Sequence, residues 1–362
     1  MSKIICNVFA LNNGRHLSML YTGFFQLFKL RRISLIQSAG ANELYSKLHT
    51  GDYALLHDNS NSLWVSVNDD KLLYYDTKDS DEIDEFAAET ASFYFKRSFN
   101  PHTVPGCFQD KIYPLGLCYA VHSDRLDVNE MTRIIKEDSP YKYRKVAKYL
   151  LNSIGLPIGF FPTLSRMHEA PKSYKNLKVL FMVRAWDPYS DPEFELSAKE
   201  SEDRIIINEM RAKCLKLLKK EFGDDFYGGF AHTEFALENY PDLVLDNVLL
   251  SGPAKYISTM REFPICIATT GLHNSIGFKL AEYVAFSKAI ISEKLNFEVP
   301  GGFSADKNYL EFSTPEQCVA CAVTLVENAE IRNRMMTLNY EYYLNFLRPD
   351  NLVMRSLDIA MS

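Results

Sequence analysis

The segment TTGLHNSIGFKLAEYVAFSKAIIS, Thr269–Ser292, decides the prediction of the fold. It follows a short apolar run, Ile265–Ala268, that is typical of a buried strand. A loop with two glycines, Gly271 and Gly277, then leads into a helical pattern and a second apolar run at Ala289–Ser292. Strand, helix and strand in this order indicate a parallel βαβ unit.

The same alternation extends in both directions along the chain. Runs typical of buried strands occur at Ile4–Leu11, Val179–Val183 and Phe226–Phe230, with helical patterns between and after them. Gly155–Lys175 has three prolines and no long periodic pattern, which indicates a connection between domains. We therefore predict the α/β fold class, with two Rossmann-like doubly wound domains that face a cleft and C-terminal helices that cross back to the first domain.

The predicted boundaries follow from these patterns. The first domain spans 1–165, the second spans 176–345, and a C-terminal helix at 346–362 packs back on the first. In the first domain, Asn68-Asp69-Asp70 separates two β-rich runs and predicts a hairpin.

Composition limits the classes of partner. The chain has 362 residues, a length that suits two domains, and a formal charge of −6 that gives no general basic footprint for nucleic acid. Its seven scattered cysteines suit a reducing compartment better than a disulfide framework. No signal segment and no apolar run of about 20 residues is visible, so we expect a cytoplasmic protein, with a peripheral contact at the inner face of the membrane.

The glycine-bearing loop is a candidate anion site. Asn274 or Ser275 is expected to cap the following helix, whose N-terminal N–H groups and dipole attract negative charge. Gly271 and Gly277 would allow the backbone to approach a phosphate closely.

One turn into this helix, Lys279 and Glu282 lie three residues apart and so share one face. The lysine suits a diphosphate and the glutamate suits a ribose diol. A capped helix with a solvated Lys–Glu pair explains the same residues equally well, so the residues alone leave both interpretations open.

The core EYVAFSKAI, Glu282–Ile290, resembles the nucleotide-sugar-binding segment of GT-B fold glycosyltransferases, in particular bacterial polysaccharide and lipopolysaccharide enzymes. Their motif is Glu-x-Met/Val-Ala-x-Gly/Ser-Lys/Arg-x-Ile. The resemblance implies that Glu282 holds the donor ribose and that the loop and helix start hold the diphosphate. The donor-binding residues that it implies in this segment are Thr270, Gly271, Asn274, Ser275, Gly277, Lys279 and Glu282. Many retaining members have an earlier glutamate at the position of Asn274, so this chain departs from their pattern there.

Other segments share the resemblance, which covers about residues 176 to 347. KVLFMVR, Lys178–Arg184, is similar to the strand that opens the donor domain of these enzymes, and Arg184 stands where the family often has a phosphate-binding arginine. Phe222–Phe230 and Tyr240-Pro241-Asp242 are similar to segments of bacterial polysaccharide glycosyltransferases. The second domain would thus bind the donor, and the first would bind the acceptor.

The acceptor half offers candidates for catalysis in loops that follow its strands. His16 could remove the proton of the acceptor hydroxyl, and Asp58 is the second candidate, since some inverting GT-B enzymes use a histidine or aspartate from this half. A polar residue at a helix start explains His16 as well. Asn13, Lys96 and Arg97 are the candidate acceptor-binding residues, with the two cations suited to a lipid-linked diphosphate or an acidic glycan. A solvated basic pair is the alternative for Lys96 and Arg97.

The resemblance implies a transferase that moves a sugar from a nucleotide-activated donor to a hydroxyl of a glycan or lipid-linked acceptor, in synthesis of a bacterial surface polysaccharide. No cofactor or metal is expected, because helix capping explains the acidic Asp79-Ser80-Asp81 motif without one. A sugar-nucleotide epimerase on the same architecture and a non-catalytic binding protein with a degenerate site stay open. So do the sugar, the base, the acceptor and the anomeric outcome.

Overall fold

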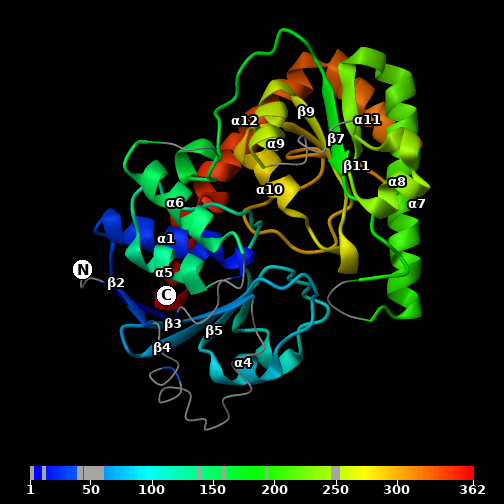
Figure 1. Cartoon of the computed structure of the whole chain (residues 1–362). Helices are drawn as coiled ribbons and strands as arrows, with labels where there is room; N and C mark the ends of the chain where they lie inside the picture. The colour runs from blue at the N-terminus through cyan, green and yellow to red at the C-terminus, as the bar shows by residue number, and fades with distance from the viewer. Residues whose placement is uncertain are drawn as a thin grey trace. The chain divides into compact units, whose positions relative to one another are not determined.

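The computed structural model describes residues 4–9, 14–38, 44, 61–136, 140–156, 160–191, 195–245 and 253–362. Its contacts divide the chain into two compact units. The first unit comprises Met1–His168, Phe297–Gly302 and Tyr343–Ser362, and the second comprises Glu169–Asn296 and Phe303–Tyr342. The first crossing between them, at His168, falls inside the proline-bearing segment Gly155–Lys175. The predicted α/β fold class is confirmed, with one sheet in each unit (Figure 1).

The first unit has a mixed sheet of six strands in the order β2-β1-β3-β4-β5-β6. The strands are β1 (Ile4–Phe9), β2 (Ile33–Ser38), β3 (Ser62–Val67), β4 (Lys71–Asp76), β5 (Phe93–Lys96) and β6 (Ile112–Pro114). β3 is antiparallel to both β1 and β4, while β1–β2, β4–β5 and β5–β6 are parallel pairs. The carboxyl ends of β1, β2, β4, β5 and β6 therefore lie at one edge, where α/β sheets bind ligands.

The antiparallel strand enters this sheet through the predicted hairpin. Val67 of β3 pairs with Lys71 of β4, so three residues form the turn between them. Asn68 and Asp69 both adopt left-handed backbone conformations, with φ of 53° and 58°, which Asn and Asp tolerate better than most residues. The sequence therefore predicted the turn from the residues that its geometry requires.

Helices cover both faces of the first unit's sheet (Figure 1). On one face α4 (Glu85–Thr90) packs against the aromatic side chains of Trp64, Tyr74 and Tyr94. On the other lie helices α1 (Ser18–Lys29), α5 (Val128–Lys136), α6 (Lys142–Ser153) and α13 (Pro349–Met361).

The C-terminal helix α13 is part of the first unit, as the sequence predicted for the end of the chain. Ser356 on α13 and Tyr75 on β4 share a buried hydrogen bond of 2.6 Å between their hydroxyl groups. The Arg355 guanidinium donates to the carbonyl oxygens of Pro114 and Leu115, which follow β6 in the chain. These contacts connect residues about 240 to 280 positions apart in the sequence.

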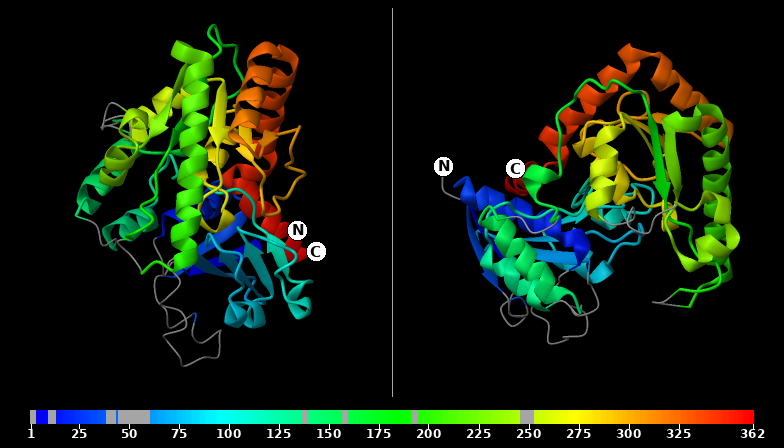
Figure 2. Two further views of the ribbon diagram at one scale, coloured as in Figure 1. Left: turned by 90° about the vertical axis from the view of Figure 1, so that its right-hand side faces the viewer. Right: turned by 45° about the horizontal axis from the view of Figure 1, so that its top comes forward.

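The second unit has a parallel sheet of five strands in the order β11-β10-β9-β7-β8. The strands are β7 (Val179–Val183), β8 (Phe226–Phe230), β9 (Ile265–Ala268), β10 (Ala289–Glu293) and β11 (Leu310–Phe312). Helices α7 (Ala198–Phe222) and α11 (Pro315–Glu327) lie on one face, and α9 (Pro253–Glu262) and α10 (Phe278–Ala285) lie on the other, as Figure 2 also shows. The described part of this unit also contains the helices α8 (Glu234–Asn239) and α12 (Ala329–Tyr342).

Among the described residues, no helix combines the length and the hydropathy that crossing a lipid bilayer requires. The longest of them, α7, has 25 residues but is rich in charged side chains.

The substitution Gly23→Ala on α1 tests how closely α1 packs against α13. A Cβ atom at this position would clash with the backbone oxygen of Pro349 and lie 2.6 Å from Cγ2 of Val353. We expect Gly23→Ala to lower the free energy of unfolding by about 1–3 kcal/mol, because a methyl group cannot enter a packed interface without a shift of backbone. Urea unfolding followed by circular dichroism measures this loss.

Gly106→Ala is the matched control. A Cβ atom there meets nothing within 4 Å, so its effect should stay within about 0.5 kcal/mol. Equal stability of the two variants would contradict the close packing of α1 on α13.

Candidate functional site

The carboxyl edge of the second unit's sheet brings together three segments that are distant in the sequence. Arg184 follows β7, Thr269–Gly271 follows β9, and Glu293 ends β10, and these three strands are neighbours in the sheet. Parallel strands place their carboxyl ends at the same edge, so the predicted donor-binding residues Arg184, Thr270 and Gly271 belong to one region.

Arg211 on α7 connects two of these segments. Its side chain is 6 % exposed, and its Nε donates to Thr269 Oγ1 at 3.0 Å. Its Nη1 donates to the carbonyl oxygen of Arg184 at 2.7 Å, and its Nη2 donates to that of Thr270 at 2.9 Å. Burial lowers the pKa of Arg211 to about 10, although the carboxylate of Glu293 opposes this shift. The guanidinium is therefore charged at neutral pH and holds the end of β7 to the loop after β9.

Thr270 is held from its other side by Glu293. The backbone N–H and the hydroxyl of Thr270 donate to Glu293 Oε2, at 2.7 and 2.9 Å. The N–H, hydroxyl and carbonyl groups of Thr270 thus all have partners within the protein, and its role in this conformation is to fix the start of the loop.

The loop then closes on itself before the helix. Gly271 N–H donates to the carbonyl oxygen of Ser275 at 2.9 Å, and a Cβ at Gly271 would lie 2.7 Å from Ser275 Oγ. His273 and Asn274 both have a φ of 56°, in the left-handed region. Asn is among the residues that adopt this region most readily, which gives a backbone reason for Asn274 at its position. Asn274 is exposed and Ser275 is buried.

The predicted cap of the helix is wrong. α10 begins at Phe278, and Gly277 is its N-cap, without a side-chain hydrogen bond. Asn274 and Ser275 belong instead to the closed loop, because two consecutive left-handed residues delay the helix. A Cβ at Gly277 would meet nothing within 4 Å, so open space adjoins this residue.

Lys279 and Glu282 lie on α10 as predicted, but neither is solvated as a surface pair would be. Lys279 is half-buried, its Nζ donates to the carbonyl oxygen of Met182 on β7, and it lies 5.6 Å from the ring centroid of Tyr256. Burial lowers the pKa of Lys279 to about 8, against the opposing effect of Glu282. Glu282 is 6 % exposed, and burial together with its charge raises the pKa of Tyr256.

Arg184 itself is exposed beside an anchored aromatic ring. Its guanidinium carbon lies 4.7 Å from the ring centroid of Trp186. The backbone N–H of Trp186 donates to Asn208 Oδ1 at 2.9 Å, and Asn208 Nδ2 donates to the Trp186 carbonyl oxygen at 2.6 Å. Further along the same loop, Arg204 donates to the Asp187 carbonyl oxygen and forms an ion pair with Asp191.

Sequence reasoning missed Arg211 and the other polar anchors of α7. Arg204, Asn208 and Arg211 are buried and continue the spacing of Leu215 and Leu218 on the inner side of the helix. A polar side chain that is buried without a hydrogen-bond partner costs free energy of desolvation. Polar residues at the spacing of a buried helix face therefore indicated that these three side chains form hydrogen bonds within the protein. What they bind is the loop that follows β7.

In the first unit, the predicted residues His16 and Arg97 meet at the carboxyl edge of the sheet. Arg97 Nη1 lies 3.0 Å from His16 Nδ1 and also pairs with Asp79. Burial and the charge of Arg97 lower the pKa of His16 to about 4, so the ring is neutral at pH 7. Because a guanidinium can only donate, His16 Nδ1 accepts and the ring proton lies on Nε2. His16 would have to leave Arg97 before Nδ1 could accept a substrate proton.

Lys96 is not open to a ligand in this structure. Its side chain is fully buried, and its Nζ is 2.8 Å from Asp76 Oδ2, which also accepts from the hydroxyl of Tyr94. The predicted residues Asn13 and Asp58 lie outside the described residues.

The acidic D-x-D motif has protein partners. Asp79 pairs with Arg97, and Asp81 Oδ2 accepts from Asn100 Nδ2 at 2.9 Å, while Asp84 is the residue that caps α4. Across the described part of the chain, no group of three or more His, Cys, Asp and Glu side chains is placed to hold a metal ion.

Comparison with known proteins finds similarity only at the level of solved structures. No family model and no curated protein matches the chain. A glycosyltransferase from Rickettsia africae matches with a TM-score of 0.40 and 11 % identity, over 94 % of this chain and 80 % of that one. The C-terminal domain of a glycosyl transferase group 1 family protein from Francisella tularensis matches with 0.32 and 13 %, over 48 % and 87 %.

A UDP-GlcNAc 2-epimerase from Neisseria meningitidis also matches, with a TM-score of 0.37 and 11 % identity over 75 % of this chain and 63 % of that one. The chain thus spans under two thirds of the epimerase. Glycosyltransferases and epimerases, the two enzyme classes that the sequence resemblance left open, both occur among these structures.

Arg211→Met tests whether the buried guanidinium holds the loop. The variant leaves the carbonyl oxygens of Arg184 and Thr270 without their donor, so we expect a loss of about 1–3 kcal/mol in the free energy of unfolding. Hydrogen exchange measured by mass spectrometry should quicken in peptides that contain residues 184–191 and 269–275.

Lys213→Met on the same helix is the control, because Lys213 is exposed and its ion pair with Glu209 is long, at 3.8 Å. Unchanged exchange of both loop peptides in Arg211→Met would contradict the anchoring role.

Proposed function

We propose that this chain is a glycosyltransferase that moves a sugar from a nucleotide-diphosphate donor to a hydroxyl group of a glycan or lipid-linked acceptor. The proposed setting is bacterial surface polysaccharide synthesis in the cytoplasm. The observation that carries the proposal is the set of cations around the ends of β7 and β9: Arg184 is exposed, Lys279 is half-buried, and the buried Arg211 is hydrogen-bonded only to neutral oxygens in the contacts described above.

This charge distribution suits a leaving diphosphate. In the transfer, the acceptor oxygen forms a bond to the anomeric carbon while the bond from that carbon to the diphosphate oxygen breaks. The hydroxyl proton passes to a base, for which His16 and Asp58 are the candidates, and negative charge develops on the diphosphate. Fixed cations at that point stabilise the transition state more than the ground state, and they supply this charge without a metal ion.

Three other predicted residues would contact further parts of the donor. Gly277 adjoins open space at the start of α10, where backbone N–H groups favour an anion. Glu282, buried beside Tyr256, would accept hydrogen bonds from the ribose hydroxyls. Asn274, exposed on the closed loop, would face the donor sugar.

Separate substitution of Arg184 and of Glu282 tests the donor assignment. We expect Arg184→Ala and Glu282→Gln each to weaken nucleotide-sugar binding about ten- to a hundredfold, since hydrogen bonds to charged groups contribute about 1.5–3 kcal/mol. Calorimetric titration of a panel of UDP-, GDP-, CDP- and ADP-sugars measures the affinities, with Lys216→Ala on the exposed side of α7 as the control.

Unchanged affinity for every nucleotide sugar in both variants would contradict the assignment of the donor site. Chromatography of the products, with and without an added acceptor, then separates the enzyme classes. A glycosyltransferase needs the acceptor, an epimerase converts the donor without one, and a binding protein leaves the donor intact.

The pKa of Lys279 predicts how binding depends on pH. This lysine is charged below about pH 8 and loses its proton as the pH rises through that value. The diphosphate of a nucleotide sugar keeps its charge in this range, so affinity should fall about tenfold between pH 7 and pH 9. Calorimetry at several pH values measures the slope.

Lys279→Met should bind more weakly at pH 7 and lose most of this dependence. If the variant and the wild type follow the same pH profile, Lys279 does not contact the diphosphate.

A further inference from the structure

Helix α6 of the first unit has a composition unlike the rest of the chain. From Tyr141 to Leu156 the sequence YKYRKVAKYLLNSIGL has four cations and no acidic residue, in a protein whose formal charge is −6. The cations are Lys142, Arg144, Lys145 and Lys148.

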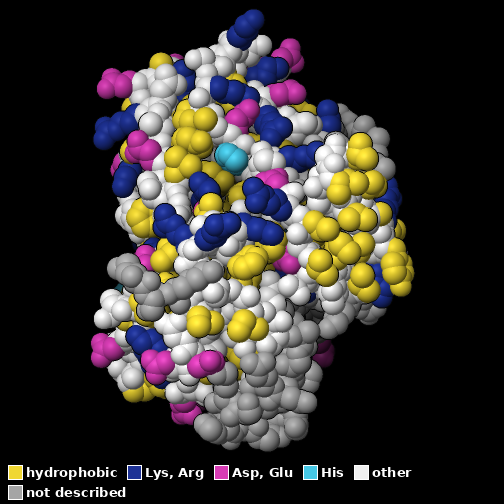
Figure 3. Space-filling view, turned by 90° about the vertical axis from the view of Figure 1, so that its left-hand side faces the viewer, with side chains coloured by type: hydrophobic (Ala, Val, Ile, Leu, Met, Phe, Trp, Pro, Cys, Tyr) yellow, Lys and Arg dark blue, Asp and Glu magenta, His cyan; other side chains and the backbone are white. Residues whose placement is uncertain are grey.

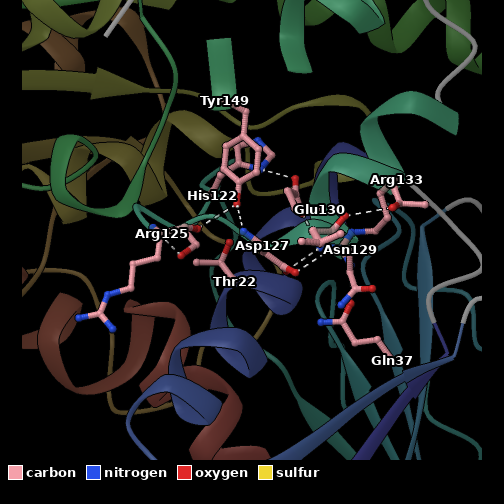
Figure 4. Close-up of polar contacts among 12 residues, drawn as sticks. Thr22, Gln37, His122, Arg125, Asp127, Asn129, Glu130, Arg133 and Tyr149 are labelled. Atoms are coloured by element: carbon pink, nitrogen blue, oxygen red, sulfur yellow. Dashed lines mark hydrogen bonds and ion pairs between the residues drawn. The ribbon is translucent and has the colours of Figure 1, made fainter. Parts of the chain in front are cut away.

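The inner side of α6 is fixed by packing and by a buried polar cluster. Tyr149 packs with Ile134 and Phe161 in a small apolar core, and Val146 adds to it. The hydroxyl of Tyr149 accepts from the backbone N–H of Asp127 at 2.9 Å and donates to the carbonyl oxygen of Arg125 at 3.0 Å (Figure 4).

The neighbouring helix α5 is fixed in the same cluster. Glu130 lies between His122 and Arg133, with its Oε1 2.7 Å from His122 Nδ1 and its Oε2 2.5 Å from Arg133 Nη2 (Figure 4). Burial would raise the pKa of Glu130, but His122 and Arg133 outweigh it and lower the pKa to about 2. Gln37 on β2 accepts a further hydrogen bond from Arg133 at 2.8 Å, so α5 is tied to the sheet and α6 is tied to α5.

Because the inner side is fixed, the exposed surface of α6 is defined as well, and one side of it has an apolar stripe. Tyr143, Ala147, Leu150 and Ile154 are spaced by four, three and four residues, the period of one helix face. We call these four residues the outer stripe. Tyr143 is 70 % exposed, Ile154 is 59 % and Leu150 is 37 %.

Arg144 and Lys148 lie on the flank of α6 next to the outer stripe, and Lys145 lies on the opposite side of the helix. Arg144 and Lys145 are exposed, and Lys148 is half-buried. Figure 3 shows Lys and Arg side chains gathered beside hydrophobic ones on the face of the molecule where α6 lies. An exposed apolar stripe beside cations, on a helix without acidic residues, is the pattern of a helix that lies in a membrane interface.

We propose that α6 docks on the surface of an anionic lipid bilayer, with the outer stripe in contact with the acyl chains and Arg144 and Lys148 in contact with lipid phosphates. Tyr143 places an amphipathic ring at headgroup depth, and the long stems of the cations cover apolar surface while their charges stay in the headgroup layer.

The charge pattern favours lipid over a protein partner. A helix that binds a second copy of a chain with a charge of −6 would gain from cations, but a protein interface usually has both signs of charge and excludes charge from its centre. A row of cations without a single carboxylate suits a surface of uniform negative charge instead. The proposal rests on α6 alone and does not depend on the transferase activity proposed above.

Vesicle flotation tests the proposal with the full chain. Wild-type protein should float with vesicles of equal parts phosphatidylglycerol and phosphatidylcholine at 50 mM salt, and float much less with pure phosphatidylcholine or at 500 mM salt. Each unit of lost positive charge should lower the partition coefficient about fivefold. The double reversal Arg144→Glu with Lys148→Glu should therefore lower it at least a hundredfold.

Ile154→Glu tests the apolar contact separately and should also release the protein from the vesicles. The matched controls lie on α7, where Lys213→Glu with Lys216→Glu reverses two exposed cations and Ile206→Glu changes an exposed isoleucine of 58 % exposure. These controls should float as the wild type does. All substituted side chains are exposed except the half-buried Lys148, and circular dichroism confirms that each variant folds.

Two results would overturn the proposal. One is wild-type protein that stays at the bottom of the gradient with anionic vesicles, or outer-stripe variants that float as well as the wild type. The other is a wild-type dimer in light scattering that Ile154→Glu converts to a monomer while vesicle binding is unaffected, which would assign the outer stripe to a second copy of the chain.

Discussion

The buried guanidinium of Arg211 is the interaction on which the second unit's site depends. Its three hydrogen bonds join the end of β7 to the loop after β9, two segments more than 80 residues apart in the sequence. A buried cation is costly, and here carbonyl and hydroxyl oxygens offset the cost, with the carboxylate of Glu293 near enough to raise its pKa. Positive charge is therefore held in place beneath the loop before any ligand arrives.

Two more side chains of α7 form hydrogen bonds with the loop that follows β7. Asn208 satisfies both backbone groups of Trp186, and Arg204 holds the chain at Asp187 and Asp191. A rigid helix thus sets the position of a loop, and the loop sets the position of the exposed Arg184. Fixing cations in advance lowers the reorganisation that charge development would otherwise require.

In the first unit, the buried cations Lys96 and Arg97 have carboxylate partners. Lys96 is neutralised by Asp76, and Arg97 is shared by His16 and Asp79. Cations that already have carboxylate partners attract a further anion weakly, whereas Arg211 relies on neutral oxygens in the contacts described. This contrast supports the proposal that the second unit binds the diphosphate and that the first binds a neutral hydroxyl acceptor.

The sequence by itself determined the elements whose signals are local. Val179–Val183 and Ile265–Ala268 are strands to the residue, because buried parallel strands are unbroken apolar runs, and Asn68 and Asp69 marked the hairpin that they form. Only the tertiary structure decided that α10 begins after a closed loop, that β3 also pairs antiparallel with β1, and that Arg211 lies at the candidate site. Those features depend on contacts between segments that are distant in the sequence. A periodic pattern indicates which face of a helix or strand is buried, but it does not identify the segment that packs against that face.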